Sequence, residues 1–258
     1  MAPGGSSEGG GMAGMGDPGG IDGIDGIDGI EALAVLGDPV RRALYAHLRA
    51  AGEPVTREAA AAAVGISRAL AAFHLDKLVE AGLADATYRR PAGRVVPGRR
   101  PKAYVPAAVE IDVTIPPRRY DLLGEILLGT VTGTPEGGSP REHAARLAAE
   151  RGREIGGRMA GDLRLRRPGT ERTLHAAAAA LAGLGFEPSA PGRGEVALRN
   201  CPFHHFAARD PQFVCGVNVA FVDGLLRGLG NETVEAVLEP VAGECCVRLR
   251  DKRAAAPG

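Results

Sequence analysis

The sequence predicts an α+β protein with two ordered domains between polar tails. Apolar residues recur at three- and four-residue spacings over 30–81 and 118–185, as they do on amphipathic helices. Short apolar runs broken by Gly and Pro follow at 83–105, 186–200 and 233–249, which is typical of strands. The length of 258 residues and the hydrophobic fraction of 45% are enough for two cores.

Residues 1–29 are expected to form a disordered tail. They are rich in Gly and contain the repeat GIDGIDGIDGI, which offers too little apolar surface to offset the entropy of ordering. Calcium binding by the repeated Asp residues is the alternative, and flexible filler is the preferred interpretation. The last residues, 253–258, are expected to form a second disordered tail.

The first ordered domain is predicted at 30–108 and begins with helices. A helical stretch over 30–51 is broken where Asp38 can cap a new helix and Pro39 fits its first position. Thr56 can cap a second helix that ends at Val64.

A further helix and a β-hairpin complete this domain. Gly65 turns the chain, Ser67 can cap a helix that runs to about residue 81, and Gly82 stops it. Strands are predicted at 83–90 and 102–105, joined by a loop that is rich in Pro, Gly and Arg.

The helix after Ser67 has the pattern of a helix that enters the major groove of DNA. Such a helix buries one face and presents its N-terminal residues to base edges. The apolar stripe Ala71, Leu75 and Leu78 supplies the buried face. For His74, a phosphate contact and a packing role are both open. The residues predicted to contact DNA are Ser67, Arg68, Ala72, Phe73, His74 and Lys77 on the helix, and Arg94, Arg99 and Arg100 in the hairpin loop.

The distribution of charge favours the same segment. The net charge of the chain is zero, but residues 36–120 carry 14 Arg and Lys against 8 Asp and Glu. Residues 1–35 carry six acidic groups and no basic group. Because neutralisation of phosphates dominates DNA affinity, a basic excess at 36–120 fits a DNA-binding segment. A solvated basic face is the alternative.

Residues 36–106 resemble the winged helix-turn-helix domain of ArsR-like bacterial transcriptional regulators. The resemblance rests on LGDPVRRALYAHL, GISRALAAFHLDKLVEAGL and GRRPKAYVP. With the segment NCPF, it extends over about 33–250 to a narrower group that includes the iron–sulfur-sensing repressor of the Suf operon. It implies a DNA-binding regulator, with repression as the expected action.

The rest of the chain is predicted to hold a helical linker and a sensor domain. Residues 109–168 contain amphipathic helices near 118–132 and 140–164, and residues 169–252 mix helices with strands. Because one recognition helix reads only a few base pairs, we expect a homodimer with these two helices as its contact. Packing of the same helices within one chain is the alternative.

All four cysteines lie in the last quarter of the chain, at Cys201, Cys215, Cys245 and Cys246. Clustered cysteines in a cytoplasmic protein favour metal or redox chemistry over structural disulfides. Thiolates suit iron–sulfur clusters and zinc, and no CxxC pair of a zinc ribbon is present. The alternatives are a thiol redox switch and buried thiols that bind nothing.

The resemblance to the Suf-type repressors implies an iron–sulfur ligand set. Three cysteines match that pattern: Cys201 in NCPF, Cys215 in PQFVC and Cys245 in GEC. The position of the middle cysteine falls in GLGNETVE, which has none. The candidates for a fourth ligand are Cys246, His204, His205, Glu232 and an external molecule.

The sequence therefore predicts a cytoplasmic DNA-binding regulator whose cysteines bind an iron–sulfur cluster, with zinc as the alternative. No apolar run is long enough to span a membrane, and no secretory signal is evident. Two other functions stay open: a regulator that responds to a small apolar ligand, and a thiol- or metal-dependent enzyme. The enzyme is disfavoured because paired carboxylates, a Ser/His/Asp order and a phosphate-binding Gly loop are not found.

Overall fold

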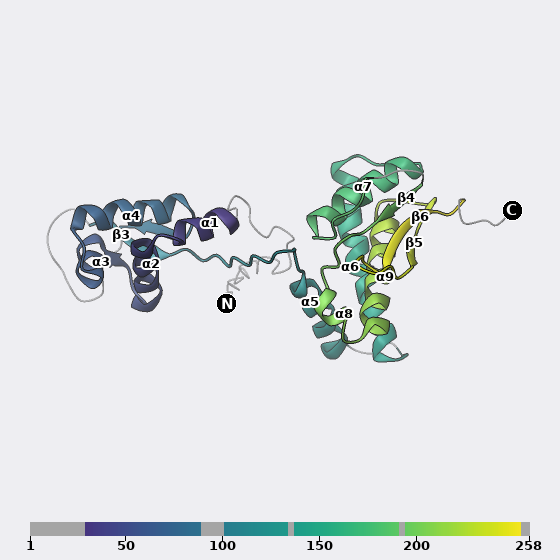
Figure 1. The fold of residues 1–258 in the computed structure, drawn as a ribbon, viewed down its shortest axis with the longest axis horizontal. Helices are drawn as coiled ribbons and strands as arrows, with labels where there is room; N and C mark the ends of the chain where they lie inside the picture. The colour runs from purple at the N-terminus through teal and green to yellow at the C-terminus, as the bar shows by residue number, and fades with distance from the viewer. Residues whose placement is uncertain (1–28, 89–100, 134–136, 191–193, 254–258) are drawn as a thin grey trace, which may run out of the picture. The chain divides into compact units, whose positions relative to one another are not determined.

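The computed structural model describes residues 29–88, 101–133, 137–190 and 194–253. The chain divides into two compact units, 1–113 and 114–258, and each combines helices with a three-stranded antiparallel sheet (Figure 1). The predicted α+β class is therefore confirmed. Of the two predicted tails, only Gly29 and Arg253 belong to the described residues.

The first unit packs four helices against a small sheet. The helices are α1 (Gly29–Leu36), α2 (Pro39–Ala51), α3 (Arg57–Val64) and α4 (Arg68–Glu80). The strands are β1 (Val55–Thr56), β2 (Ala84–Thr87) and β3 (Ala103–Pro106), in the order β1-β3-β2. The two predicted strands are present with shifted bounds, whereas β1 was not anticipated because two residues carry no periodic signal.

Three predicted helix caps are confirmed. The Asp38 carboxylate accepts hydrogen bonds from the backbone N–H groups of Val40 and Arg41, each at 2.9 Å. The Thr56 hydroxyl caps α3 and the Ser67 hydroxyl caps α4, each accepting one backbone N–H at 3.2 Å. Each cap satisfies N–H groups that have no partner inside the helix, and so it fixes where the helix begins.

Five side chains form the centre of the first core. They are fully or almost fully buried, and they come from α2, α4 and β3: Leu44, Leu48, Leu75, Leu78 and Tyr104. Because α4 supplies two of them, its orientation is tied to α2 and to the sheet.

The second unit is built around two long helices. Its helices are α5 (Tyr120–Thr132), α6 (Pro140–Asp162), α7 (Thr170–Gly183), α8 (His204–Ala207) and α9 (Pro211–Gly228). Its strands are β4 (Glu195–Ala197), β5 (Val234–Leu238) and β6 (Val247–Asp251), in the order β4-β6-β5. The hairpin expected at 186–200 is reduced to an isolated bridge between Pro188 and Leu198, and β4 pairs with β6 instead.

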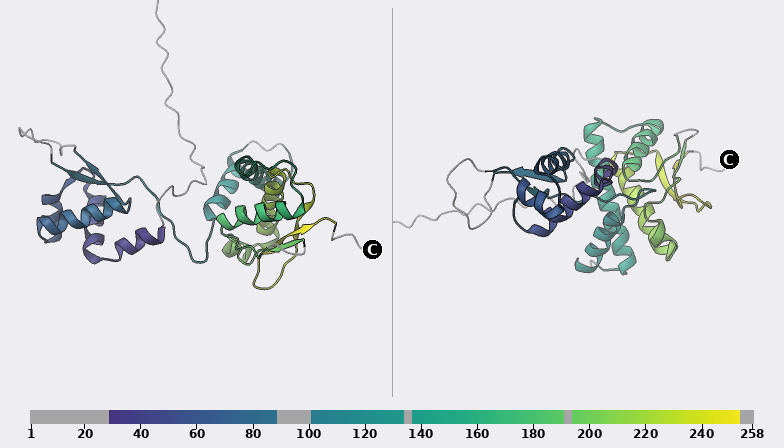
Figure 2. Two further views of the ribbon diagram at one scale, coloured as in Figure 1. Left: turned by 90° about the horizontal axis from the view of Figure 1, so that it is seen from above. Right: turned by 60° about the vertical axis from the view of Figure 1, so that its left-hand side comes forward.

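Helices α6 and α9 lie side by side in very close contact, with β5 and β6 against α9 (Figure 1 and Figure 2). Glycines at the crossing make this approach possible. A Cβ added at Gly152 or Gly156 would overlap the α9 backbone, and one added at Gly224 or Gly228 would overlap the α6 backbone. The position of α9 is therefore set by backbone contact.

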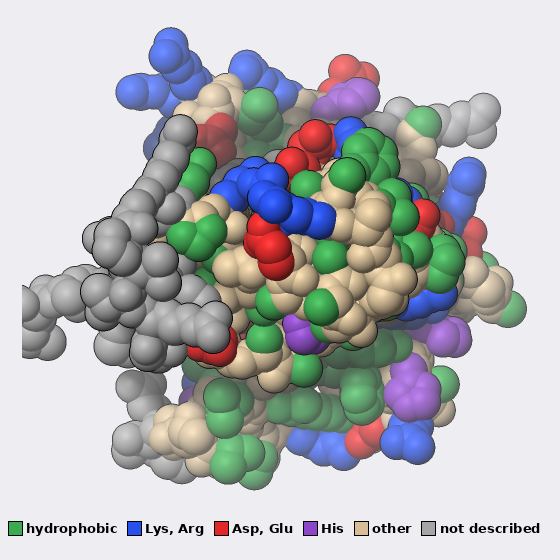
Figure 3. Space-filling model, turned by 90° about the vertical axis from the view of Figure 1, so that its left-hand side faces the viewer, with side chains coloured by type: hydrophobic (Ala, Val, Ile, Leu, Met, Phe, Trp, Pro, Cys, Tyr) green, Lys and Arg blue, Asp and Glu red, His purple; other side chains and the backbone are tan. Residues whose placement is uncertain are grey.

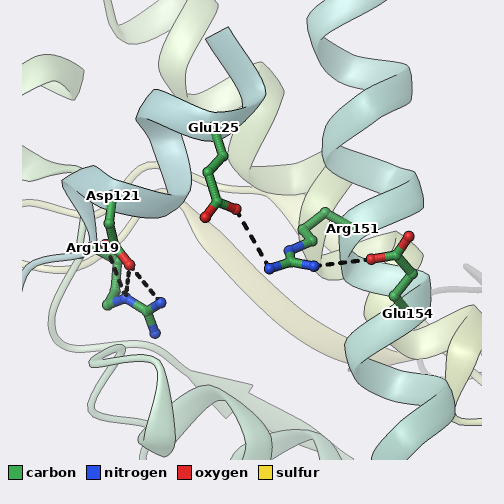
Figure 4. Close-up of polar contacts among 5 residues, drawn as sticks. All are labelled: Arg119, Asp121, Glu125, Arg151 and Glu154. Atoms are coloured by element: carbon green, nitrogen blue, oxygen red, sulfur yellow. Dashed lines mark hydrogen bonds and ion pairs between the residues drawn. The ribbon is translucent and has the colours of Figure 1, made fainter. Parts of the chain in front are cut away.

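Helix α5 packs against α6 and is also tied to it by charge (Figure 4). Arg151 on α6 lies 3.4 Å from Glu125 on α5 and 3.1 Å from Glu154 one turn further along α6. At the start of α5, Arg119 pairs with Asp121 at 2.7 Å. The two helices expected to join subunits thus pack together within one chain.

Within the described ranges, no helix is both long enough and apolar enough to cross a membrane.

The glycine crossing can be tested by adding one methyl group. Gly224→Ala is expected to lower the free energy of unfolding by about 1–3 kcal/mol, because the methyl group meets the Ala149 carbonyl oxygen. Gly157→Ala on α6 is the matched control, since a Cβ there meets nothing within 4 Å. It should be neutral or stabilise by about 0.5–1 kcal/mol. Equal urea unfolding curves for the two variants would contradict the packing described.

Candidate functional site

Helices α3 and α4 form a helix-turn-helix whose turn is residues 65–67. Gly65 has a φ of 73°, which an L side chain adopts only with strain, and its N–H donates to the Ala61 carbonyl at 2.9 Å. Ile66 donates to the same carbonyl at 3.0 Å, and Ser67 then caps α4. These contacts fix the angle at which α4 leaves the turn.

The two faces of α4 differ in solvent exposure. Ala71, Leu75 and Leu78 are fully buried, as the predicted stripe requires. The opposite face carries exposed side chains, including Arg68, Leu70 and Phe73 in its first two turns. A groove-binding helix needs one buried face and one free N-terminal face, and α4 has both.

The helix residues predicted to contact DNA occupy different environments. Ser67 is exposed but its hydroxyl acts as the cap, and Ala72 is half-buried. Phe73 is 54% exposed. The Arg68 guanidinium is exposed and pairs with Glu58 on α3 at 2.8 Å, while Lys77 pairs with Glu80 at 2.5 Å. Surface pairs of this kind are weak, so both cations are available to phosphate. Arg94, Arg99 and Arg100 lie outside the described residues.

His74 lies on the buried side of α4. It is only 7% exposed, and its ring makes an edge contact with Phe73 at 5.2 Å between centroids. Its Nδ1 is buried without a hydrogen-bond partner among the described residues. Of the two roles open from sequence, this environment fits packing, and a phosphate contact stays a prediction.

A polar contact that no sequence motif indicated joins α4 to β3. The Asp76 carboxylate accepts hydrogen bonds from Lys102 Nζ at 2.6 Å and from the Tyr104 hydroxyl at 2.9 Å. Burial alone would raise the pKa of Asp76, but these two hydrogen bonds outweigh it and hold the pKa below its ordinary value of 3.8. The contact fixes α4 to the sheet at the base of the hairpin.

The four cysteines, which we call the cysteine centre, lie in one place although they span 46 positions of sequence. Cys215 on α9 forms a disulfide with Cys246, which directly precedes β6. Cys201 and Cys245 are buried free thiols, joined to each other by a hydrogen bond. The adjacent positions of Cys245 and Cys246 connect the two pairs.

The two free thiols differ in acidity. The hydrogen bond from Cys245 lowers the pKa of Cys201, and the positive charge of Arg118 adds to the effect. The same hydrogen bond, together with burial, raises the pKa of Cys245. Cys201 is thus the more readily ionised thiol of the pair, and thiolate is the form that binds metals and reacts.

Asn218 is a buried polar residue at this centre. It is fully buried on α9, and its Nδ2 donates to Cys245 Sγ at 3.2 Å. Its Oδ1 has no hydrogen-bond partner in the part of the chain that the structure describes. Burying an amide with one unsatisfied oxygen costs free energy. The surroundings of the sulfurs therefore include a polar group as well as apolar side chains.

With the disulfide closed, the centre does not form a metal site. Two sulfurs are bonded to each other, and no group of three or more His, Cys, Asp or Glu side chains among the described residues is arranged to hold a metal ion. His204 and His205 are exposed on α8, and Glu232 is exposed before β5. Opening the disulfide would offer four thiols, the donors that iron–sulfur clusters and zinc prefer.

The segment that carries Cys201 is bonded to the start of the second unit. Asn200 Nδ2 donates to the carbonyl oxygens of Pro117 at 2.9 Å and Gly185 at 2.5 Å. Arg118 donates to Asn200 Oδ1 at 2.6 Å and to the Cys201 carbonyl at 3.0 Å. Residues 114–119 lead directly from the first unit, so this network connects the cysteine segment to the chain between the units.

Comparison with known proteins identifies the domain in the first unit. A family model described as a helix-turn-helix domain matches residues 36–85, which include α2, α3 and α4. Searches of curated proteins and of solved structures give no match. The chain thus carries a helix-turn-helix domain at residues 36–85, which supports a DNA-binding transcriptional regulator.

The contact between α4 and β3 predicts a stability that depends on pH. Asp76→Asn should lower the free energy of unfolding at pH 7 by about 1 kcal/mol, because Asp76 is half-exposed and its bonds are partly screened. Since the folded-state pKa of Asp76 is lowered, its contribution is complete above its unfolded-state pKa and disappears as the pH falls through the folded-state value. The difference from wild type should therefore shrink below about pH 4.

The matched control is Asp85→Asn, which removes an exposed carboxylate from β2. Urea unfolding of the two variants at pH 7 and pH 3 makes the comparison. Equal losses in the two variants, or a difference that persists at pH 3, would show that the Asp76 bonds do not stabilise the domain.

The pairing of the cysteines predicts a labelling pattern. Metal-free protein purified in air and denatured without reductant should take up alkylating reagent at Cys201 and Cys245 only. Peptide mass mapping should recover Cys215 and Cys246 as one linked pair. Labelling of all four cysteines, or linkage of Cys201 to Cys245, would contradict this arrangement.

Proposed function

We propose that the chain is a bacterial cytoplasmic transcriptional repressor that binds operator DNA through α4 and is controlled by its cysteine centre. The observation that carries the proposal is the helix-turn-helix at 57–80, whose second helix has a buried face and a free N-terminal face. Repression is the action implied by the resemblance to Suf-type regulators.

In this proposal α4 enters the major groove and the β2–β3 hairpin acts as a wing. Arg68 reads a base edge or a phosphate near the start of α4, and Lys77 binds phosphate further along it. The basic excess of residues 36–120, which includes Arg94, Arg99 and Arg100 between β2 and β3, supports a wing that follows the DNA backbone.

The cysteine centre is proposed as the sensor. A cellular dithiol that supplies two electrons and two protons would convert the disulfide into the thiols of Cys215 and Cys246. With Cys201 and Cys245 these thiols then bind an iron–sulfur cluster, or alternatively zinc. Bound metal would hold the segments that carry these cysteines together, and its loss would release them.

The hydrogen bonds of Asn200 and Arg118 offer a route from this centre to the DNA-binding unit. They join the Cys201 segment to residues 117 and 118, close to the chain that connects the two units. A change in the Cys201 segment therefore alters the anchoring of that connection. The proposed control is a coupling of two sites through a shared element.

The protein is proposed to act as a homodimer. Leu128 and Val131 on α5 are 63% and 83% exposed, whereas the other face of α5 packs on its own unit. A second copy supplies the second recognition helix that an operator of two half-sites requires.

Arg68 provides a direct test of DNA binding by α4. Arg68→Ala should weaken binding to a duplex selected from random sequences with the full chain by about 10- to 100-fold, the scale of one specific arginine contact. Arg49→Ala on α2 is the control for loss of an exposed arginine in the same unit and should bind like wild type. Fluorescence anisotropy at fixed salt measures both. Equal affinities of the three proteins would exclude Arg68 from the interface.

The sensor proposal is tested by anaerobic purification. The protein should be coloured and contain iron and sulfide, or else colourless with bound zinc, and Cys201→Ser should lose metal. His204→Ala removes an exposed donor outside the centre and should keep it. The sensor proposal is contradicted if wild-type protein is colourless, contains no metal and keeps the same DNA affinity after oxidation. The DNA-binding proposal is unaffected by that result.

A further inference from the structure

The exposed face of α4 carries two large apolar side chains at its N-terminal end. Leu70 is 40% exposed and Phe73 is 54% exposed. They are three residues apart on α4, so they lie on the same face of the helix. Together with the exposed Ala69 they form what we call the apolar face of α4.

Packing within the first unit does not explain this face. The core of that unit takes Ala71, Leu75 and Leu78 from the opposite side of α4 and buries them fully. Side chains of the size of Leu and Phe gain roughly 1.5–3 kcal/mol from full burial, so a partner that covers the exposed parts of Leu70 and Phe73 would gain a fraction of this stabilisation. Figure 3 shows one face of the molecule, on which hydrophobic side chains (green) lie at the surface among basic (blue) and acidic (red) groups.

The position of the face in the helix-turn-helix identifies the partner. The second helix of this motif lies in the major groove, and its first residues contact base edges. Leu70 and Phe73 fall within the first two turns of α4, inside the segment matched as a helix-turn-helix domain.

The polar groups on this part of α4 are few. The Ser67 hydroxyl accepts the Leu70 N–H, and Arg68 pairs with Glu58. No Asn or Gln occurs anywhere in α4, so the bidentate amide contact to adenine is not available to this helix. The apolar group that the major groove presents is the C5-methyl group of thymine.

We propose that Leu70 and Phe73 determine DNA specificity by packing against thymine methyl groups in each operator half-site. The inference rests on the proposed DNA-binding function and adds the chemistry of the recognised base. The preferred operator should carry A·T pairs where the first two turns of α4 enter the groove, while Arg68 contacts a neighbouring guanine or a phosphate.

The experiment replaces thymine by uracil, which removes the methyl group and leaves the base pairing intact. A duplex selected with the full-length protein is synthesised with deoxyuridine at each half-site thymine in turn. At the contacted positions wild-type affinity should fall about fourfold per methyl group, the scale of one buried methyl. Leu70→Ala with Phe73→Ala should bind more weakly and lose the preference for thymine over uracil.

The matched control is Leu33→Ala, which removes a leucine from α1 that is 52% exposed. It should keep the full preference for thymine over uracil. Because Leu70 and Phe73 are exposed, the double variant should also keep the unfolding midpoint of wild type, so that weaker binding reflects the interface.

The outcomes separate this inference from the function on which it rests. If wild type selects no duplex, the DNA-binding proposal fails and the inference fails with it. If wild type binds a selected duplex with equal affinity for thymine and uracil at every position, only the inference is overturned. If the double variant keeps the preference but loses the dimer mass in sedimentation, the apolar face is a protein contact and the inference is again overturned.

Discussion

The geometry of the DNA-binding unit depends on the burial of one face of α4. Ala71, Leu75 and Leu78 lose all contact with solvent, and this burial holds the helix against α2 and the sheet. Gly65 sets the direction in which α4 begins, and Asp76 secures its second half to β3 through Lys102 and Tyr104. The opposite face is thereby presented as a rigid surface, which a groove-binding helix requires.

The second unit depends on a comparable constraint at the α6–α9 crossing. Backbone contact at its glycines fixes the position of α9 against α6. Helix α9 carries both Cys215 and Asn218. The remaining cysteines come from the NCPF segment and from the residues before β6, so the centre exists only because three separate segments meet. Asn200 bonds the segment that carries Cys201 to Pro117, near the start of the second unit, and the proposed control of DNA binding depends on this bond.

Local features were predictable from sequence and long-range pairings were not. The helix caps of Asp38, Thr56 and Ser67 follow from residue type and spacing, because each cap bonds within three residues. The partner of Cys215 is 31 positions away and is set by how α9 packs on β6, so the spacing of cysteines could not reveal it. Asn200 stands in the NCPF segment without an assigned role and Asn218 belongs to no motif, so the roles of both emerge only from their bonds. Helix α8 has four residues, too few for a periodic pattern.

The most direct test of the account compares the operator affinity of one protein in two states of its cysteine centre. Protein purified anaerobically with its metal is titrated with the selected operator, and the same sample is titrated after removal of the metal and closure of the Cys215–Cys246 disulfide. The account predicts affinities that differ by tenfold or more, within the range of ordinary coupling between sites, and a difference that disappears when Asn200→Ala weakens the connection. Equal affinities of the two wild-type states would contradict it.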